Sequence, residues 1–137
     1  MRYLCQKGYP LTLVAPGNDV GEILRVAKML CPAFEQTIIL GYPPFCKTFI
    51  DAGIAQQIPW ADFNLKMVFA GEVFSEEWRL LVAKRAGIKS PKSDIHGIYG
   101  TADAGMLALY PLWIFLFNKR FGRCHQLISM NNRRFSV

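Results

Sequence analysis

Two glycine–carboxylate combinations are the residues of this chain that could do chemistry. Gly71 and Glu72 follow an apolar run at residues 67–70, while Gly100 and Asp103 follow a second run at residues 95–99. Glycine lets a backbone approach a flat base or a phosphate closely, and a carboxylate can hold Mg²⁺ or a ribose hydroxyl. The carboxyl ends of parallel strands meet at one edge of a sheet, where ligands bind in open α/β folds. The spacing therefore predicts a nucleotide site between the two strand ends.

The elements that must position these residues alternate between strands and helices. Apolar runs predict four buried strands, at residues 11–15, 37–40, 67–70 and 95–99. Between them, helical spacing or a helix-start signal follows Asp19, Pro43 and Ser75. This β-α-β-α-β-α-β order with short connections predicts an α/β fold, with a mostly parallel sheet and helices on both faces.

Local signals also predict where the helices begin and end. Asp19 with Glu22 three residues later resembles a capping box, and Ser75 is a good N-cap for the third helix. Gly53 is a candidate for the end of the second helix, and Gly87 suits the end of the third. The core face of the third helix is expected to consist of Trp78, Leu81 and Val82.

The net charge of +6 is unevenly distributed. Residues 1–109 hold 11 Lys and Arg against 10 Asp and Glu, whereas residues 110–137 hold five basic residues and no acid. The basic character therefore does not describe a nucleic-acid-binding face, and we expect no nucleic-acid partner. We expect residues 1–109 to form a partial nucleotide- and acyl-binding α/β domain, and residues 110–137 to be an atypical apolar, then basic tail.

The apolar part of this tail leaves three interpretations open. Residues 107–117 are apolar, but about 20 such residues are needed to span a bilayer, so we do not expect a membrane protein. A buried strand or helix, an interfacial anchor with a basic flank, and a tail that does not fold are the alternatives.

The usual catalytic and metal-binding motifs are missing from the sequence. The four cysteines form no C-x-x-C pair and only two histidines are present, which argues against zinc. No Ser-His-Asp arrangement or G-x-S-x-G elbow is found, and Cys46 is interpreted as a core residue. His96, expected just before the fourth strand tip, is a candidate ligand contact. The turn at residues 17–21 is a weaker one, since it also suits an ordinary capped turn. No secretory signal is evident, so free thiols and a cytoplasmic location are expected.

Three segments together resemble the phenylacetate–CoA ligase family. They are GYPPF at 41–45, NLKMVFAGEVFSEEW at 64–78 and IYGTADAG at 98–105. This family includes the synthetases that adenylate a deazaflavin coenzyme, and it belongs to the acyl-adenylate-forming superfamily. The resemblance covers about residues 11–107. It implies a two-step reaction in which ATP and a carboxylic acid give acyl-AMP, from which a thiol, usually CoA, displaces AMP.

The resemblance also implies roles for the residues at the strand ends. Tyr99 would stack on adenine, Gly100 would allow its close approach, and Asp103 stands where the family usually has a Glu that helps to hold Mg²⁺. Thr101 lies beside Ala102, which replaces a Ser or Thr that usually meets the α-phosphate. The segment that would pack beside the adenine and the acyl pocket is Ala70, Gly71 and Glu72. The acyl side would be lined by the segment from Tyr42 to Phe45, including Pro43.

Other family features have no counterpart in this chain. The phosphate loop, the distal ribose-binding Asp and the C-terminal lid with its catalytic Lys are not found. We therefore expect an internal fragment of a larger adenylate-forming N-terminal domain, inactive alone and with no catalytic residue of its own. The charge break near residue 110 suggests an end foreign to the family. The alternative is a non-catalytic nucleotide-binding or protein-interaction module, whose exposed sheet edge could support self-association.

Overall fold

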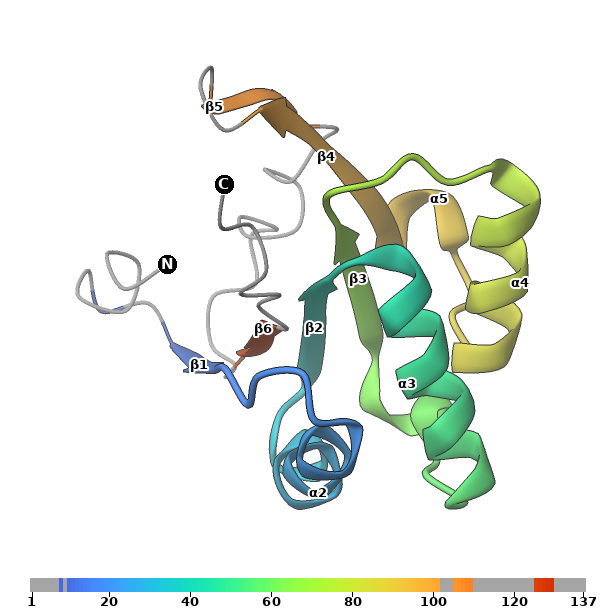
Figure 1. The fold of residues 1–137 in the computed structure, drawn as a ribbon. Helices are drawn as coiled ribbons and strands as arrows, with labels where there is room; N and C mark the ends of the chain where they lie inside the picture. Colours follow the sequence, from blue (N-terminus) through green and yellow to red (C-terminus); the bar gives the residue numbers. More distant parts are fainter. Residues whose placement is uncertain (1–7, 9, 102–104, 110–124, 130–137) are drawn as a thin grey trace.

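The computed structural model describes residues 8, 10–101, 105–109 and 125–129, which form a six-stranded sheet with helices packed against it (Figure 1). The strand order is β1-β6-β2-β3-β4-β5. All neighbours are parallel except β4 and β5, which are antiparallel. The predicted α/β class with a mostly parallel sheet is confirmed. The strands are β1 Leu11–Val14, β2 Gln36–Gly41, β3 Leu65–Phe69, β4 Ile95–Thr101, β5 Gly105–Leu109 and β6 His125–Ser129.

The three long helices share one face of the sheet. They are α2 Val20–Leu30, α3 Pro43–Ala55 and α4 Glu76–Ala86. Ile39, Met67 and Phe69 point from the sheet into a core that all three helices complete, whereas Ile38 and Val68 belong to a separate cluster. Since successive side chains of a strand point to opposite faces, the second cluster lies on the other face. Helices were expected on both faces, but the long described helices cover only one. Right-handed crossovers that advance in one direction along a sheet place every helix on the same side.

The predicted helix starts are confirmed by their caps. The Asp19 carboxylate accepts a hydrogen bond from the Glu22 backbone N–H at 2.8 Å, so residues 17–21 form a capped turn. The Ser75 hydroxyl accepts one from the Trp78 N–H at 3.2 Å. Gly87 ends α4 in the left-handed region with φ 67°. These signals lie within a few residues of one another, which explains why the sequence predicted them.

Two expectations about the helices were wrong. Gly53 does not end α3, which continues to Ala55. Leu81 is not a core residue, because its side chain is turned to solvent. Val82 lies in the core as expected, together with Ala83 and Ala86, and Trp78 packs against it. Three short helices connect the longer elements: η1 Cys31–Ala33, η2 Trp60–Phe63 and α5 Pro91–Asp94. None of the helices in the described ranges is long and apolar enough to cross a membrane.

The tail contributes to the sheet. β6 lies between β1 and β2 and is parallel to both, so a tail that does not fold, one of the possibilities left open, does not describe residues 125–129. Pairing over such a sequence separation leaves no local pattern, and for this reason it could not be predicted from the sequence. The remaining residues of the tail lie outside the described part of the chain.

Gly53 is required where it is because Trp60 packs against it. A Cβ atom at Gly53 would lie 2.1 Å from Trp60 Cζ2. The Trp60 ring is fixed by an Nε1–H bond to the Ile50 carbonyl at 3.1 Å and by Phe49 at a ring-centroid distance of 4.9 Å.

We therefore expect Gly53→Ala to destabilise the fold by about 1–3 kcal/mol, because overpacking outweighs the helix-propensity gain of about 1 kcal/mol. Urea unfolding measures the change. Gly21→Ala is the control, since its Cβ would meet only one Asp19 carboxylate oxygen, at 3.2 Å. Equal stability of both variants and the wild type would contradict the role assigned to Trp60.

Candidate functional site

The carboxyl ends of β2 and β3 are joined at one edge of the sheet. The Ala70 N–H donates to the Gly41 carbonyl at 3.1 Å, so the two backbone segments remain hydrogen-bonded one residue beyond β3. Beyond this point the Tyr42 hydroxyl lies near the Glu72 carboxylate and interacts with it. This interaction and burial raise the pKa of Tyr42. The structure thus brings together two segments that the sequence assigned to one site.

Gly71 lies between these two contacts in a conformation that favours glycine. Its φ is +94°, and a Cβ atom there would stand 3.6 Å from the Tyr42 ring. Ala70, Gly71 and Glu72 are exposed. An exposed glycine backbone beside a tyrosine ring gives a flat ligand both a close approach and an aromatic neighbour.

The acyl-side residues begin α3 and differ in exposure. Tyr42 is 38% exposed, whereas Pro43 is buried and Phe45 packs against the helix-side core. Among these three only Tyr42 is well placed to meet a ligand. Pro43 and Pro44 have no N–H, so the first turn of α3 offers fewer donors than most helix starts. This start suits an apolar or acyl group better than a phosphate.

β4 differs from the predicted strand end. Phe69, the last residue of β3, is in register with Gly97, so β4 continues for four residues beyond it to Thr101. Gly100 and Thr101 do not follow the strand but belong to it, in register with Met106 and Gly105 of β5. The expected break at Gly100 is replaced by an irregularity in register between Tyr99 and Gly100. Tyr99 lies in the same strand, before this irregularity.

Asp103, predicted to help hold Mg²⁺ near the phosphates of the nucleotide, lies outside the described residues. Within the described ranges, no group of three or more His, Cys, Asp or Glu side chains could hold a metal ion. The described part of this edge therefore consists of the carboxyl ends of β2, β3 and β4.

His96 is not at the strand tip. It is the second residue of β4, where it is buried, and its Nε2–H donates to the Ser93 carbonyl at 2.9 Å. Burial lowers its pKa, and the charges of Arg79 and Lys66 act in the same direction. Its expected place near the strand tip was wrong, because β4 extends well past it. Its contact with a ligand stays a prediction.

The lowered pKa of His96 makes stability depend on pH. Below pH 6.5, the ordinary pKa of histidine, His96 is protonated in the unfolded chain but still neutral in the folded chain. The free energy of unfolding therefore decreases as pH falls from about 6.5 through the folded pKa. We expect urea midpoints to decrease more between pH 7.5 and pH 5 for the wild type than for His96→Gln. Parallel curves for the two proteins would contradict this.

Cys46 is excluded as a nucleophile. It is fully buried in α3, and burial raises the pKa of its thiol to about 12. A thiol is nucleophilic only as the thiolate, so the core interpretation is confirmed.

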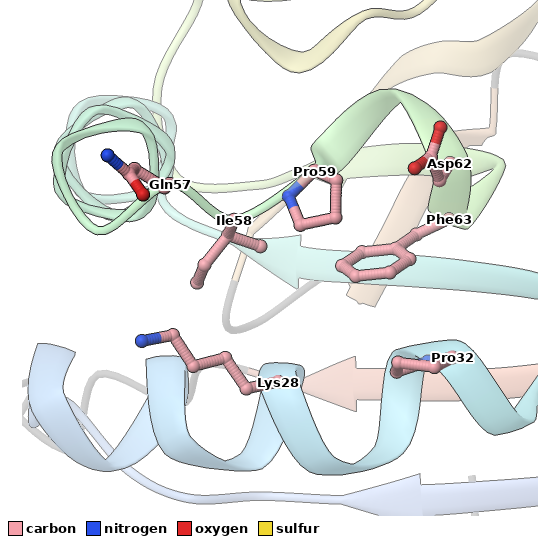
Figure 2. Close-up of a pocket in the computed structure, with 7 residues that line it drawn as sticks. All are labelled: Lys28, Pro32, Gln57, Ile58, Pro59, Asp62 and Phe63. Atoms are coloured by element: carbon pink, nitrogen blue, oxygen red, sulfur yellow. The ribbon is translucent and has the colours of Figure 1, made fainter.

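A hollow of about 470 Å³ at the opposite edge of the sheet was not predicted from the sequence (Figure 2). The C-terminal part of α2 and η1 form one wall, and the connection before β3 forms the other. The Lys28 ammonium donates to Gln56 Oε1 at 2.9 Å beside it. Because its walls come from two separate connections, no local motif marks it. The lining residues are Lys28, Pro32, Gln57, Ile58, Pro59, Asp62 and Phe63.

Comparisons of the chain with protein-family models, with curated proteins and with solved structures found no match. Its function has therefore to be inferred from its residues and their arrangement.

The Tyr42–Glu72 interaction is directly testable. Replacing the carboxylate by an amide in Glu72→Gln removes the negative charge and the strong acceptor, so we expect the pKa of Tyr42 to decrease. ¹³Cζ-tyrosine NMR as a function of pH measures it, and Glu77→Gln is a matched control. An unchanged Tyr42 titration in Glu72→Gln would show that the two strand ends are not coupled through this interaction.

Proposed function

We propose that this chain is an internal fragment of an ATP-dependent acyl- or aryl-acid ligase, and that it supplies adenosine and acyl contacts without being active alone. The observation that carries the proposal is the joining of the β2 and β3 ends through Ala70–Gly41 and Tyr42–Glu72. It makes one surface from the two segments that resemble the family's acyl and adenine contacts.

The position of this surface supports a ligand site. β2, β3 and β4 are adjacent and parallel, so their carboxyl ends lie at the edge where open α/β sheets bind ligands. Gly71 would let adenosine approach the backbone, and Tyr42 would border the acid. The proposed nucleotide side is completed by Tyr99, Gly100, Thr101 and Asp103. Of these, Asp103 would help to hold Mg²⁺.

The proposed reaction needs more than these contacts. Transfer of AMP to a carboxylate depends on positioning and on stabilising charge at the phosphates. No phosphate loop or lid lysine is found in the sequence to supply that charge. The fragment is therefore proposed to bind, while adenylation and transfer to CoA need the rest of a longer protein.

The proposed compartment is the cytoplasm. ATP and CoA are abundant there, and thiols stay reduced. Among the described cysteines, Cys31 and Cys46 are both buried and form no disulfide. This arrangement needs no oxidising environment.

Isothermal titration with AMP tests the nucleotide side. We expect binding by the wild type and at least about tenfold weaker binding by Gly71→Ala, because the added methyl group would prevent adenosine from approaching the backbone closely. A tenfold loss corresponds to about 1.4 kcal/mol of binding free energy. Gly17→Ala is the matched control, since Gly17 also has a positive φ, of 82°, and open space around it. Absent binding, or equal losses in both variants, would refute the nucleotide site.

A non-hydrolysable phenylacetyl-sulfamoyl adenosine distinguishes a ligase fragment from a non-catalytic nucleotide module. A ligase fragment is expected to bind this mimic of acyl-AMP at least about tenfold more tightly than AMP, and Tyr42→Ala should remove the difference. Equal affinity for the two ligands would favour the non-catalytic module. Pyrophosphate exchange by the isolated chain would overturn the proposed inactivity but leave the ligase assignment intact.

A further inference from the structure

The outward side of α4 carries an apolar pair between two opposite charges. Leu80 is 52% exposed and Leu81 is 42% exposed. At 100° per residue, Glu77, Leu80, Leu81 and Lys84 fall within one arc of about 100°, opposite the core face of the helix. We call these four residues the α4 stripe. Figure 1 shows α4 at the outside of the helical layer, next to α3.

The charges of the stripe differ from the other charges of α4. Glu76 and Arg79 pair with each other at 3.3 Å, and Arg85 pairs with Asp51 of α3 at 2.5 Å. Lys84 makes no ion pair within the described part of the chain. Glu77 makes none there either; hydrogen bonds from its own backbone and from Ser75 lower the pKa of its carboxyl, which stays ionised at neutral pH.

The α4 stripe can pair with an antiparallel copy of itself. Its midpoint falls between Leu80 and Leu81, and Glu77 and Lys84 are equally far from this point. In an antiparallel helix pair related by a two-fold axis, Leu80 of one copy would meet Leu81 of the other. Glu77 would then face Lys84 at both ends. A two-fold contact of this kind is closed, because each residue meets its counterpart in both directions.

Single exposed leucines are common on protein surfaces and need no explanation. Here two adjacent leucines coincide with flanking charges of opposite sign that have no ion-pair partner among the described residues. A hydrophobic centre with a charged rim is the usual anatomy of an interface. We propose that the α4 stripe is a docking surface for a second copy of this chain, with the two α4 helices antiparallel. This inference does not depend on the proposed ligase function.

The size of the stripe limits the strength of the contact. Stable protein interfaces bury about 800 Å² on each partner, which is more than four side chains of one short helix supply. The dimer is therefore expected to be weak and to form only at high protein concentration. The charges are expected to set the antiparallel orientation more than the affinity.

Sedimentation equilibrium of the full chain, at concentrations up to roughly 1 mM, tests the apolar centre. We expect a monomer–dimer equilibrium whose dissociation constant rises at least about tenfold in Leu80→Gln/Leu81→Gln. Met29→Gln on α2 is the matched control, because Met29 is exposed to a similar extent (59%) but lies outside the stripe. Circular dichroism confirms that each variant is folded. A monomeric wild type, a species larger than a dimer, or equal weakening by the control would overturn the proposal.

Charge reversal tests the antiparallel orientation separately. Glu77→Lys or Lys84→Glu alone places like charges opposite each other at both ends, so we expect about three- to tenfold weaker dimers at low salt. The double variant Glu77→Lys/Lys84→Glu restores opposite charges across the interface and should recover the wild-type dissociation constant to within about twofold. A double variant as weak as the single ones would overturn the antiparallel pairing, since a purely structural role for either residue predicts no recovery.

Discussion

The parallel pairing of β2 with β3 is the constraint on which the rest of the structure depends. Residues 37–41 are in register with residues 65–69, so side chains at matching positions point to the same face. Ile39, Met67 and Phe69 enter the helix-side core, and Ile38 and Val68 enter the opposite cluster. A slip of one residue in either strand would exchange these faces. The same register brings Gly41 beside Ala70, and hence Tyr42 beside Glu72.

One-sided covering of the sheet follows from this order of strands and shapes the outer surface. Because α2, α3 and α4 form a single layer, no further long helix of the described chain lies beyond α4. Val82, Ala83 and Ala86 face the core and Trp78 packs against it, while Leu80 and Leu81 face outward. These two leucines are therefore left to solvent or to a partner. The carboxyl edge and the α4 stripe are thus two separate consequences of one layered architecture.

Features set by neighbouring residues could be predicted from the sequence, and features set by distant ones could not. The caps at Asp19 and Ser75 are local hydrogen bonds, and the apolar runs of β1 to β4 are local patterns. On α4, Trp78 and Val82 face the core as predicted, but Leu81 was misplaced because apolar residues surround that helix and its periodicity is ambiguous. The place of β6 between β1 and β2 depends on pairing across most of the chain. In the candidate site, the coupling of Tyr42 to Glu72 required the register of two strands, and His96 was misplaced because the length of β4 was underestimated.

We propose that the joined ends of β2 and β3 bind adenosine. A ¹H–¹⁵N NMR titration of the chain with AMP, with amide shifts assigned to residues, tests this. We expect the largest shifts at Gly41, Tyr42, Ala70, Gly71 and Glu72, with little change around Lys28 and Phe63 at the opposite edge. Shifts concentrated at that opposite hollow, or none at millimolar AMP, would contradict it.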